Sequence, residues 1–324
     1  MLNVLVVGKI NCLVAMTENT VAAFQQAGCN VRCFATNGNN VALKLSLKLR
    51  RADPARVGAL VGERLSKSVK AFRPDLLVYV LGAWQPEMVY QMGSSVLPQA
   101  ISVAWVSDNF TQTQMVFSRY MDSIFCTDTY FIQQLREHGY TKPTSYLPLA
   151  MDPKRFYPSD IVRENKIVYV AKNSPGRAAF IRNVERPLHL YGKKWKSFSA
   201  SQHRIDPRPV SLGQLSKLYA SSRAVLNLKN EQSVVRGINQ RSFEPYGCKT
   251  PVLNDDIEDL KLCFELGKEI LVYRSVEELH TLHDKLTSDQ NYARAVGEAG
   301  YRRVIAEHTY AARATALLQQ TGLV

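Results

Sequence analysis

The stretch RSFEPYGCKTPVLN, at residues 241–254, decides how this 324-residue chain is interpreted. It follows an apolar run at residues 224–228, which is typical of a parallel strand buried on both faces. The order of elements is then a strand, a loop, a short helix with one glutamate, a turn and another strand. The carboxylate of that glutamate, Glu244, is suited to accept two charge-assisted hydrogen bonds from vicinal hydroxyl groups, such as those of a ribose. The stretch therefore predicts a parallel α/β domain that binds its ligand where the strands end.

Strands and helices alternate through both halves of the chain. In the first half, strands are expected at residues 4–7, 31–34, 75–80, 101–106 and 123–126, and helices at 17–27, 41–51, 58–72 and 129–138. In the second half, strands are expected at residues 166–170, 188–192, 224–228, 251–254 and 270–273, and helices at 176–184, 212–220, 276–287 and 292–318. Such repeated strand–helix units imply parallel sheets with right-handed crossovers.

A proline-spaced stretch at residues 147–158 separates the two series and is typical of an interdomain connection. We therefore expect an α/β protein with two facing Rossmann-like domains, at residues 1–155 and 156–324. The C-terminal helix is a candidate to pack back on the first domain. Ligands of such folds bind at the carboxyl ends of the strands, here in the cleft between the domains.

The composition is that of a globular protein, with 46% hydrophobic and 21% charged residues. No apolar run approaches the roughly 20 residues that span a bilayer. The N-terminal segment, residues 1–8, reads as a first strand and not as a signal peptide. We expect a cytoplasmic protein and leave membrane association open.

The formal net charge of +13 favours an anionic partner. Much of the basic excess lies between Lys44 and Arg73, a segment with only two acidic residues, Asp53 and Glu63. A lipid-linked glycan at an anionic membrane surface fits this segment, through peripheral contact, and so does DNA, whose phosphates bind Lys and Arg without sequence specificity. A solvated basic face is the alternative.

Several common site motifs do not occur. The chain has neither a GxGxxG fingerprint nor a P-loop, and its six cysteines show no metal-binding spacing. The pair Asp255-Asp256 follows a predicted strand and is interpreted as a turn. We therefore expect no metal site.

The second half of the chain resembles the C-terminal domain of CgeB-like (spore-coat-protein-type) glycosyltransferases, a GT-B branch. These enzymes follow a strand and a loop with Arg-x-Phe-Glu and then Cys-Gly-Thr-Pro. This chain has Arg241-x-Phe243-Glu244 and Cys248-Lys249-Thr250-Pro251. Further matching segments lie at residues 147–158, 215–228, 264–279 and 299–310. The resemblance implies the GT-B fold and transfer of a sugar from a nucleoside-diphosphate donor.

The resemblance also implies donor-binding residues. Glu244 would hold the ribose, and Arg241, near the start of the same helix, would hold the diphosphate. Phe243 would complete the motif. The loop that runs from Lys229 to Gly237 would lie against the donor sugar and phosphates.

Two further cations, Lys172 and Arg177, follow the first strand of the second half and could reach the pyrophosphate. Many relatives carry a second glutamate eight residues before the ribose glutamate. Arg236 stands there instead, which leaves the donor sugar open and makes Arg236 a candidate to neutralise the leaving diphosphate. Asp108 is the candidate general base or acceptor contact, with a loop or helix cap as the alternative.

Four residues at predicted strand ends of the first half are candidates to bind the acceptor. Gly8 and Asn11 follow the first strand, while Trp84 and Trp105 lie at the ends of two central strands. Two departures affect the glutamate helix. Lys249 replaces a Gly at a position that tends to be left-handed, and Pro245 requires the helix to be short.

These observations together predict a hexosyl or pentosyl transferase that uses a nucleotide sugar, with a UDP-sugar favoured, and that needs no metal or other cofactor. By family analogy the reaction would retain the anomeric configuration. The acceptor is a glycan, a lipid-linked glycan, nucleic acid or, in third place, a protein. The alternatives are a non-catalytic sugar-nucleotide or nucleic-acid-binding protein on a degenerate scaffold, and a nucleotide-sugar epimerase of the same fold.

Overall fold

The computed structural model describes residues 1–12, 15–38, 53–82, 84–230 and 233–324. Two compact units are present. Unit 1 comprises residues 1–148, 231–235 and 310–324, and unit 2 comprises residues 149–230 and 236–309. Each contains a six-stranded parallel sheet, which confirms the expected α/β architecture. The helix expected at residues 41–51 lies outside the described residues.

The sheet of unit 1 has the strand order β2-β1-β3-β4-β5-β6. The strands are β1 (Asn3–Gly8), β2 (Asn30–Ala35), β3 (Leu76–Leu81), β4 (Ile101–Val106), β5 (Ser123–Cys126) and β6 (Thr144–Tyr146). The central strands are apolar because both faces of the sheet are covered. The order reverses direction between β1 and β3, which is the topological switch point of this unit.

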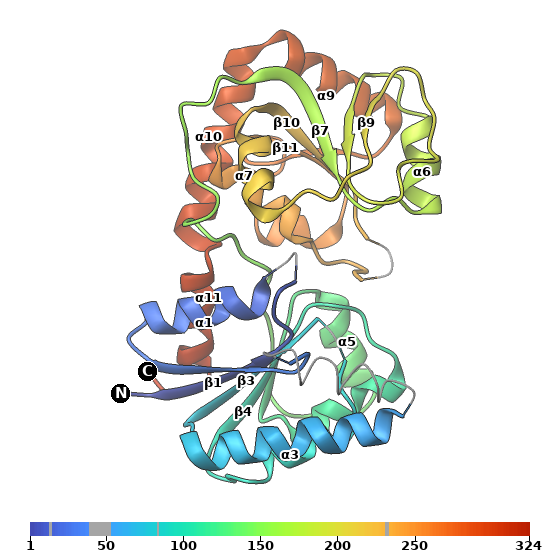
Figure 1. Ribbon diagram of the computed structural model, residues 1–324. Coiled ribbons are helices and arrows are strands. Elements are labelled where there is room, and N and C mark those ends of the chain that lie inside the picture. The colour runs from blue at the N-terminus through green and yellow to red at the C-terminus, as the bar shows by residue number, and fades with distance from the viewer. Residues whose placement is uncertain (13–14, 39–52, 83, 231–232) are drawn as a thin grey trace. The chain divides into compact units, whose positions relative to one another are not determined.

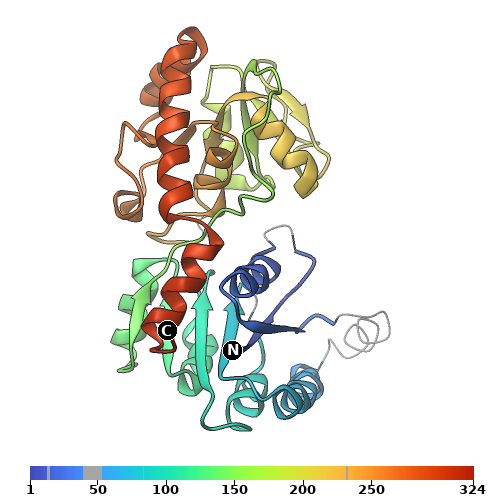
Figure 2. The same cartoon turned by 90° about the vertical axis from the view of Figure 1, so that its left-hand side faces the viewer.

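Helices cover both faces of the unit 1 sheet. They are α1 (Met16–Gln26), α3 (Pro54–Phe72), α4 (Glu87–Ser94), the 3₁₀ segment η1 (Gln112–Tyr120), α5 (Thr129–Glu137) and α11 (Tyr310–Gln320). Both views show α1 and α11 side by side on one face and the long α3 on the other (Figure 1 and Figure 2). The buried side of α3, with Leu65 and Val69, packs on Leu5 and Tyr79 of the sheet.

The sheet of unit 2 has the order β12-β11-β10-β7-β8-β9. The strands are β7 (Glu164–Val170), β8 (His189–Tyr191), β9 (Arg204–Asp206), β10 (Ser222–Asn227), β11 (Val252–Asp255) and β12 (Leu271–Tyr273). The direction of strand order reverses between β7 and β10, which pair in parallel with Leu226 opposite Tyr169. In this topology a ligand is expected beyond the carboxyl ends of these two strands.

The helices of unit 2 lie on both sides of its sheet. They are α6 (Pro175–Arg182), α7 (Leu212–Ala220), η2 (Gln240–Ser242), α8 (Glu244–Gly247), η3 (Glu258–Leu262), α9 (Val276–Ser288) and α10 (Gln290–Glu307). Ile181 of α6 and Leu279 of α9 belong to one hydrophobic core with Tyr169 and Leu226 of the sheet. This packing fixes the start of α6 beside the carboxyl end of β7.

One predicted element is wrong. The helix expected at residues 292–318 is two helices, α10 and α11, with a break at His308 and Thr309. The His308 imidazole hydrogen-bonds the Cys263 carbonyl, and Thr309 forms an isolated β-bridge with Met151. These contacts take the backbone out of helical geometry at a point where helical periodicity continues in the sequence.

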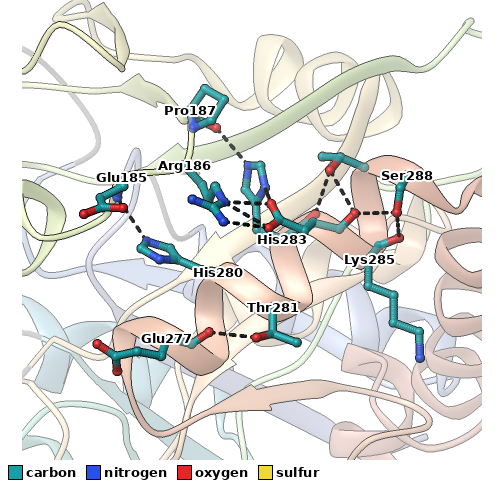
Figure 3. Close-up of polar contacts among 11 residues, drawn as sticks. Glu185, Arg186, Pro187, Glu277, His280, Thr281, His283, Lys285 and Ser288 are labelled. Atoms are coloured by element: carbon teal, nitrogen blue, oxygen red, sulfur yellow. Dashed lines mark hydrogen bonds and ion pairs between the residues drawn. The ribbon is translucent and has the colours of Figure 1, made fainter.

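The connection between α6 and β8 is pinned to α9 (Figure 3). The Glu185 amide donates to His280 Nε2, and the His283 Nε2–H donates to the Pro187 carbonyl. Arg186 forms an ion pair with Asp284, with 2.9 Å between Nε and Oδ1. We call residues 185–187 with His280, His283 and Asp284 the α9 polar cluster. It holds the C-terminal side of α6 in place.

Candidate active site

The polar side chains of unit 2 gather where β7, β10 and β11 end. Val170 and Asn227 are the last residues of β7 and β10, and Asn254 lies opposite Asn227 in the register of β10 and β11. This edge includes the switch point of the sheet, so the topology alone marks it as the candidate ligand site.

Glu244 is the most unusual group at this edge. It begins the four-residue helix α8 and is only 5% exposed. Among the described residues, no group donates a hydrogen bond to its carboxylate. Burial raises the pKa of Glu244 to about 8, while the nearby charges of Arg241 and Arg155 act to lower it. A buried carboxyl group without donors has unmet hydrogen-bonding capacity, which a ligand with hydroxyl groups would fill.

The position of α8 is fixed by close backbone packing. A Cβ on Gly247 would lie 2.6 Å from the Phe156 carbonyl oxygen, and one on Gly297 of α10 would lie 2.2 Å from the Lys249 carbonyl oxygen. The helix is as short as expected, and Pro245 falls in its first turn. Lys249 has a φ of 56°, so it occupies the left-handed conformation that was expected at this position.

Side-chain contacts from Arg163 and Lys249 also fix the turn after α8. The Arg163 guanidinium donates to the carbonyl of Cys248 at 2.6 Å and to the Thr250 hydroxyl at 2.6 Å. The Lys249 ammonium pairs with Glu298 of α10 at 2.9 Å. These contacts offset the strain of a left-handed lysine and keep Glu244 in a single position.

Arg241 lies in η2 and not in the helix that carries Glu244, so the expectation of one shared helix is wrong. Its Nε donates to Asn227 Oδ1 at 3.0 Å, and its Nη1 donates to the Val170 carbonyl at 3.3 Å. The half-buried guanidinium therefore spans the ends of β10 and β7. A helix of one turn has little dipole to offer, so Arg241 itself is the cation available for a phosphate here.

A second carboxylate, the half-buried Asp255, ends β11. Both of its oxygens accept from the Lys229 amide, at 3.2 and 3.1 Å. Burial raises the pKa of Asp255 to about 6, against the lowering effects of these hydrogen bonds and of Arg241. The interpretation of Asp255 as a plain turn residue is therefore incomplete, because its carboxylate faces the site.

Arg177 begins α6 and points back to the same edge. Its Nη1 donates to the Lys172 carbonyl at 3.0 Å. Burial lowers the pKa of Arg177, and the charges of Tyr169, Arg241 and Asp255 also act on it, so the four side chains are neighbours. Lys172 itself is exposed in the loop between β7 and α6. The structure thus brings Arg177, Arg241, Glu244 and Asp255 together; we call these four residues the carboxyl-edge site.

Three other residues that were predicted to contact the donor are buried or form an ion pair: Phe243, Gly237 and Arg236. The Phe243 ring is fully buried between Phe264 and His308, at centroid distances of 5.5 and 5.1 Å. Arg236 forms an ion pair with Glu258, with 3.4 Å between Nε and Oε2, and Gly237 beside it is buried.

In unit 1, Asp108 and Gly8 both follow central strands. Burial raises the pKa of Asp108, and a side-chain hydrogen bond with Ser233 acts against this. Gly8 is closely packed, since a Cβ there would lie within 2.4 Å of the Thr17 hydroxyl oxygen. The exposed Asn11 has a φ of 57°, and its amide donates to Glu18.

The two tryptophans of unit 1 make aromatic contacts. Trp105 is fully buried, donates from Nε1 to the Leu147 carbonyl and packs edge-on against Tyr310. Trp84 is half-buried and packs against Phe110 and Phe117. Both rings therefore have packing partners within unit 1.

Sequence reasoning missed Asn227, Asp255 and Arg155. The apolar strands β10 and β11 each end in a polar residue, Asn227 and Asp255 respectively. This pattern was a usable signal, because strand ends at a switch point form ligand sites. Arg155 lies in the connecting stretch at residues 147–158, and its charge acts on Glu244 in the folded protein. Within the described ranges, no group of three or more His, Cys, Asp or Glu side chains is arranged to hold a metal ion.

The carboxyl-edge site combines two chemistries. Arg177 and Arg241 supply charge for a phosphate, and Glu244 supplies hydrogen-bond acceptors for paired hydroxyl groups. A nucleoside diphosphate carries both groups in one molecule.

Comparison with known proteins agrees with this geometry. Residues 167–319 match the family model described as Glycosyl transferase-like. No curated protein sequence matches the chain.

Solved structures share the fold across the whole chain. Sucrose-phosphate synthase from Thermosynechococcus elongatus is 13% identical, with a TM-score of 0.70 over 100% of this chain and 99% of that one. HepE (Alr3699) of Anabaena, solved in complex with UDP and glucose, is 11% identical, with a TM-score of 0.70 over 100% of both chains.

A putative UDP-N-acetylglucosamine 2-epimerase from Listeria monocytogenes is 10% identical, with a TM-score of 0.59 over 100% of this chain and 97% of that one. At such identities these likenesses show the fold alone, and they do not confirm the CgeB-like subfamily. Residues 167–319 thus resemble a glycosyl transferase-like domain, and the chain has the GT-B fold.

Proposed function

We propose that this protein is a glycosyltransferase that binds a nucleoside-diphosphate sugar at the carboxyl-edge site of unit 2. The observation that carries the proposal is the Glu244 carboxyl group, which is buried beside Arg241 and accepts no hydrogen bond from the described residues. A ribose would supply two donors to this carboxylate, and the free energy of those bonds offsets its burial. The family match of residues 167–319 supports sugar transfer in general.

Arg177 and Arg241 are the groups we assign to the diphosphate, with Lys172 at the exposed rim. Their charge would stabilise the leaving nucleoside diphosphate as the glycosidic bond breaks. We propose that this suffices without a metal ion, that the anomeric configuration is retained, and that the nucleotide is UDP. The UDP complex of the structurally similar HepE is in keeping with the last point.

The acceptor is proposed from charge. On α3 the side chains of Arg64, Lys67 and Lys70 are exposed, and Arg73 follows at the end of the helix. None of them forms an ion pair with another described residue. Such a face suits an anionic acceptor, with a lipid-linked glycan at a membrane surface ranked before nucleic acid. No helix among the described residues is long and apolar enough to cross a bilayer.

A thermal-shift panel of UDP, GDP, CDP, ADP and dTDP sugars tests the donor assignment. One nucleotide should stabilise the wild type, and Glu244→Gln should abolish most of that shift. The matched control is Glu137→Gln, which changes an exposed glutamate of α5 and should leave the shift intact. Undiminished donor affinity in Glu244→Gln would refute the assignment.

Catalysis needs a separate test, because a non-catalytic sugar-nucleotide-binding protein would pass the first one. Slow release of UDP from UDP-glucose without an acceptor, lost in Glu244→Gln, would support a transferase. Interconversion of the free donor without nucleotide release would instead indicate an epimerase, whose fold this chain also shares.

A further inference from the structure

Behind Arg241 lies a buried pair of asparagines at the ends of β10 and β11. Asn227 and Asn254 are both 0% exposed, and Asn227 Nδ2 donates to Asn254 Oδ1 at 2.7 Å. Both amides make further hydrogen bonds. Asn227 Oδ1 accepts from Arg241 Nε, and Asn254 Nδ2 donates to Asp255 Oδ1 at 3.1 Å. A continuous series of hydrogen bonds therefore joins Arg241 to Asp255.

The series also fixes the backbone around the site. Asn239 Nδ2 donates to Asn227 Oδ1 at 3.1 Å, which ties the approach to η2 to the end of β10. The Ser242 hydroxyl donates to Asn254 Oδ1 at 2.9 Å. At the far end, Asp255 accepts from the Lys229 amide, where the loop after β10 begins. Buried networks of this kind set one geometry when their members are satisfied.

The choice of an amide at position 227 has an electrostatic consequence. A carboxylate there would also accept from Arg241 Nε, but it would neutralise the guanidinium. The neutral Asn227 orients Arg241 without cancelling its positive charge. The only carboxylate of the network, Asp255, acts on Arg241 from the end of the neighbouring strand.

We propose that Asn227, Asn254 and Asp255 are positioning residues that aim the Arg241 guanidinium at the donor diphosphate, with Asp255 as a distant counter-charge that weakens this binding when ionised. The inference rests on the proposed function and deepens it. It assigns the diphosphate, and not the nucleoside, as the part of the donor whose affinity this network controls.

The pH dependence follows from the surroundings of Asp255. The charged and titratable groups that act on it or are acted on by it are Tyr169 of β7, Arg177 of α6, Lys229 after β10, Arg241 of η2 and Tyr273 of β12. Burial raises the pKa of Asp255 to about 6. As pH falls from 7 to 5, Asp255 gains a proton and its counter-charge is lost. UDP-glucose keeps the charge of its diphosphate over this range, so the wild type should gain affinity relative to Asp255→Asn, in which the counter-charge is absent at every pH. Protonation of Glu244 acts on both proteins alike and cancels in this comparison.

The test measures, by NMR titration, the affinity for a nucleoside diphosphate and for the corresponding nucleoside. UDP, GDP, CDP, ADP and dTDP are first titrated into the wild type, and the one that binds most tightly is then used together with its nucleoside. Asn227→Asp should weaken binding of the nucleoside diphosphate by about tenfold or more, whereas the affinity for the nucleoside should change by less than about twofold. Asp255→Asn, which keeps an acceptor for the Lys229 amide, should increase the affinity for the nucleoside diphosphate at pH 7. Its higher affinity for UDP-glucose, relative to the wild type, should disappear as pH falls from 7 to 5.

The outcomes separate this inference from the proposed function. Glu244→Gln should weaken nucleoside and diphosphate alike, because it acts on the ribose. If Asn227→Asp does the same, or if Asp255→Asn weakens the diphosphate, the network is merely structural and the inference fails. If Asn227→Asp does not fold, the comparison of Asp255→Asn with the wild type decides, and a difference in UDP-glucose affinity that stays constant between pH 7 and pH 5 overturns the inference. If no nucleotide binds the wild type, both proposals fail.

Discussion

The α9 polar cluster and the carboxyl-edge site belong to the same unit, and each contains buried or half-buried ionisable groups. In the α9 polar cluster these side chains have partners within the protein: Arg186 pairs with Asp284, His280 accepts from the Glu185 amide, and His283 donates to the Pro187 carbonyl. Figure 3 shows the cluster. At the carboxyl-edge site, Glu244 is about as buried as His283 but accepts no hydrogen bond from the described residues. Polar groups that are satisfied by the protein stabilise the fold, whereas a buried group left without donors indicates a ligand.

The largest effect should come from the packing that supports Glu244. Gly297→Ala places a Cβ about 2.2 Å from the Lys249 carbonyl oxygen, so α8 or α10 has to move. We expect a loss of roughly 3 kcal/mol in the free energy of unfolding, together with loss of nucleotide binding. Urea unfolding and a UDP titration measure the two effects.

The control for this change is Gly213→Ala in α7, where a Cβ would meet nothing within 4 Å. Stability there should stay the same or rise slightly. Equal destabilisation by both substitutions would show that the contact with Lys249 does not limit the packing of α8.

The second effect concerns the stability of the unliganded protein. The folded-state pKa of Glu244, about 8, is above its ordinary value of 4.5. The native state therefore binds this proton more tightly than the unfolded state, and stability from this group is present below pH 4.5 and lost as pH rises towards 8. Asp255 acts in the same direction between its ordinary value of 3.8 and about 6.

Glu244→Gln removes the Glu244 contribution to this pH dependence. The difference in Tm between Glu244→Gln and the wild type should therefore grow from pH 5 to pH 9, reaching about 3 °C or more in favour of the variant. Melting curves across this range measure it. A difference that shrinks with pH would mean that the carboxylate is stabilised by protein contacts, as in the α9 polar cluster.

A third, smaller effect is proton release on nucleotide binding. At pH 7 the Glu244 carboxyl group is largely protonated, and hydrogen bonds from ribose hydroxyls favour its ionised form. Binding of UDP should release up to about one proton per site. Calorimetry in buffers of different ionisation enthalpy measures this number, which should fall to near zero in Glu244→Gln. Net proton uptake by the wild type would contradict the ribose assignment.

The smallest effect is expected in the α9 polar cluster. Arg186→Ala removes a largely exposed ion pair and should leave the Tm of the protein nearly unchanged. UDP affinity should change by less than about twofold, because the pair makes no contact with the carboxyl-edge site. A larger loss of affinity would show that the connection after α6 controls the position of Arg177.

The comparison also shows which parts of the site a sequence reveals. Glu244 could be predicted because it lies in a contiguous motif between two apolar strands. Asp255 also follows a strand, but its role depends on β11 lying next to β10, a neighbour relation between distant segments. The separation of Arg241 and Glu244 into η2 and α8 depends on local backbone geometry that residue spacing does not encode.

The sequence by itself determined the α/β class and most of the element boundaries. Strands buried on both faces require continuous apolar runs, and amphipathic helices require a period near 3.6 residues; both signals are local. Only the tertiary structure decided that the last helical segment breaks at His308, that Phe243 faces the core, and that Glu244 lies buried beside Arg241. These features arise from contacts between residues far apart in the chain, whose free energy no local pattern contains.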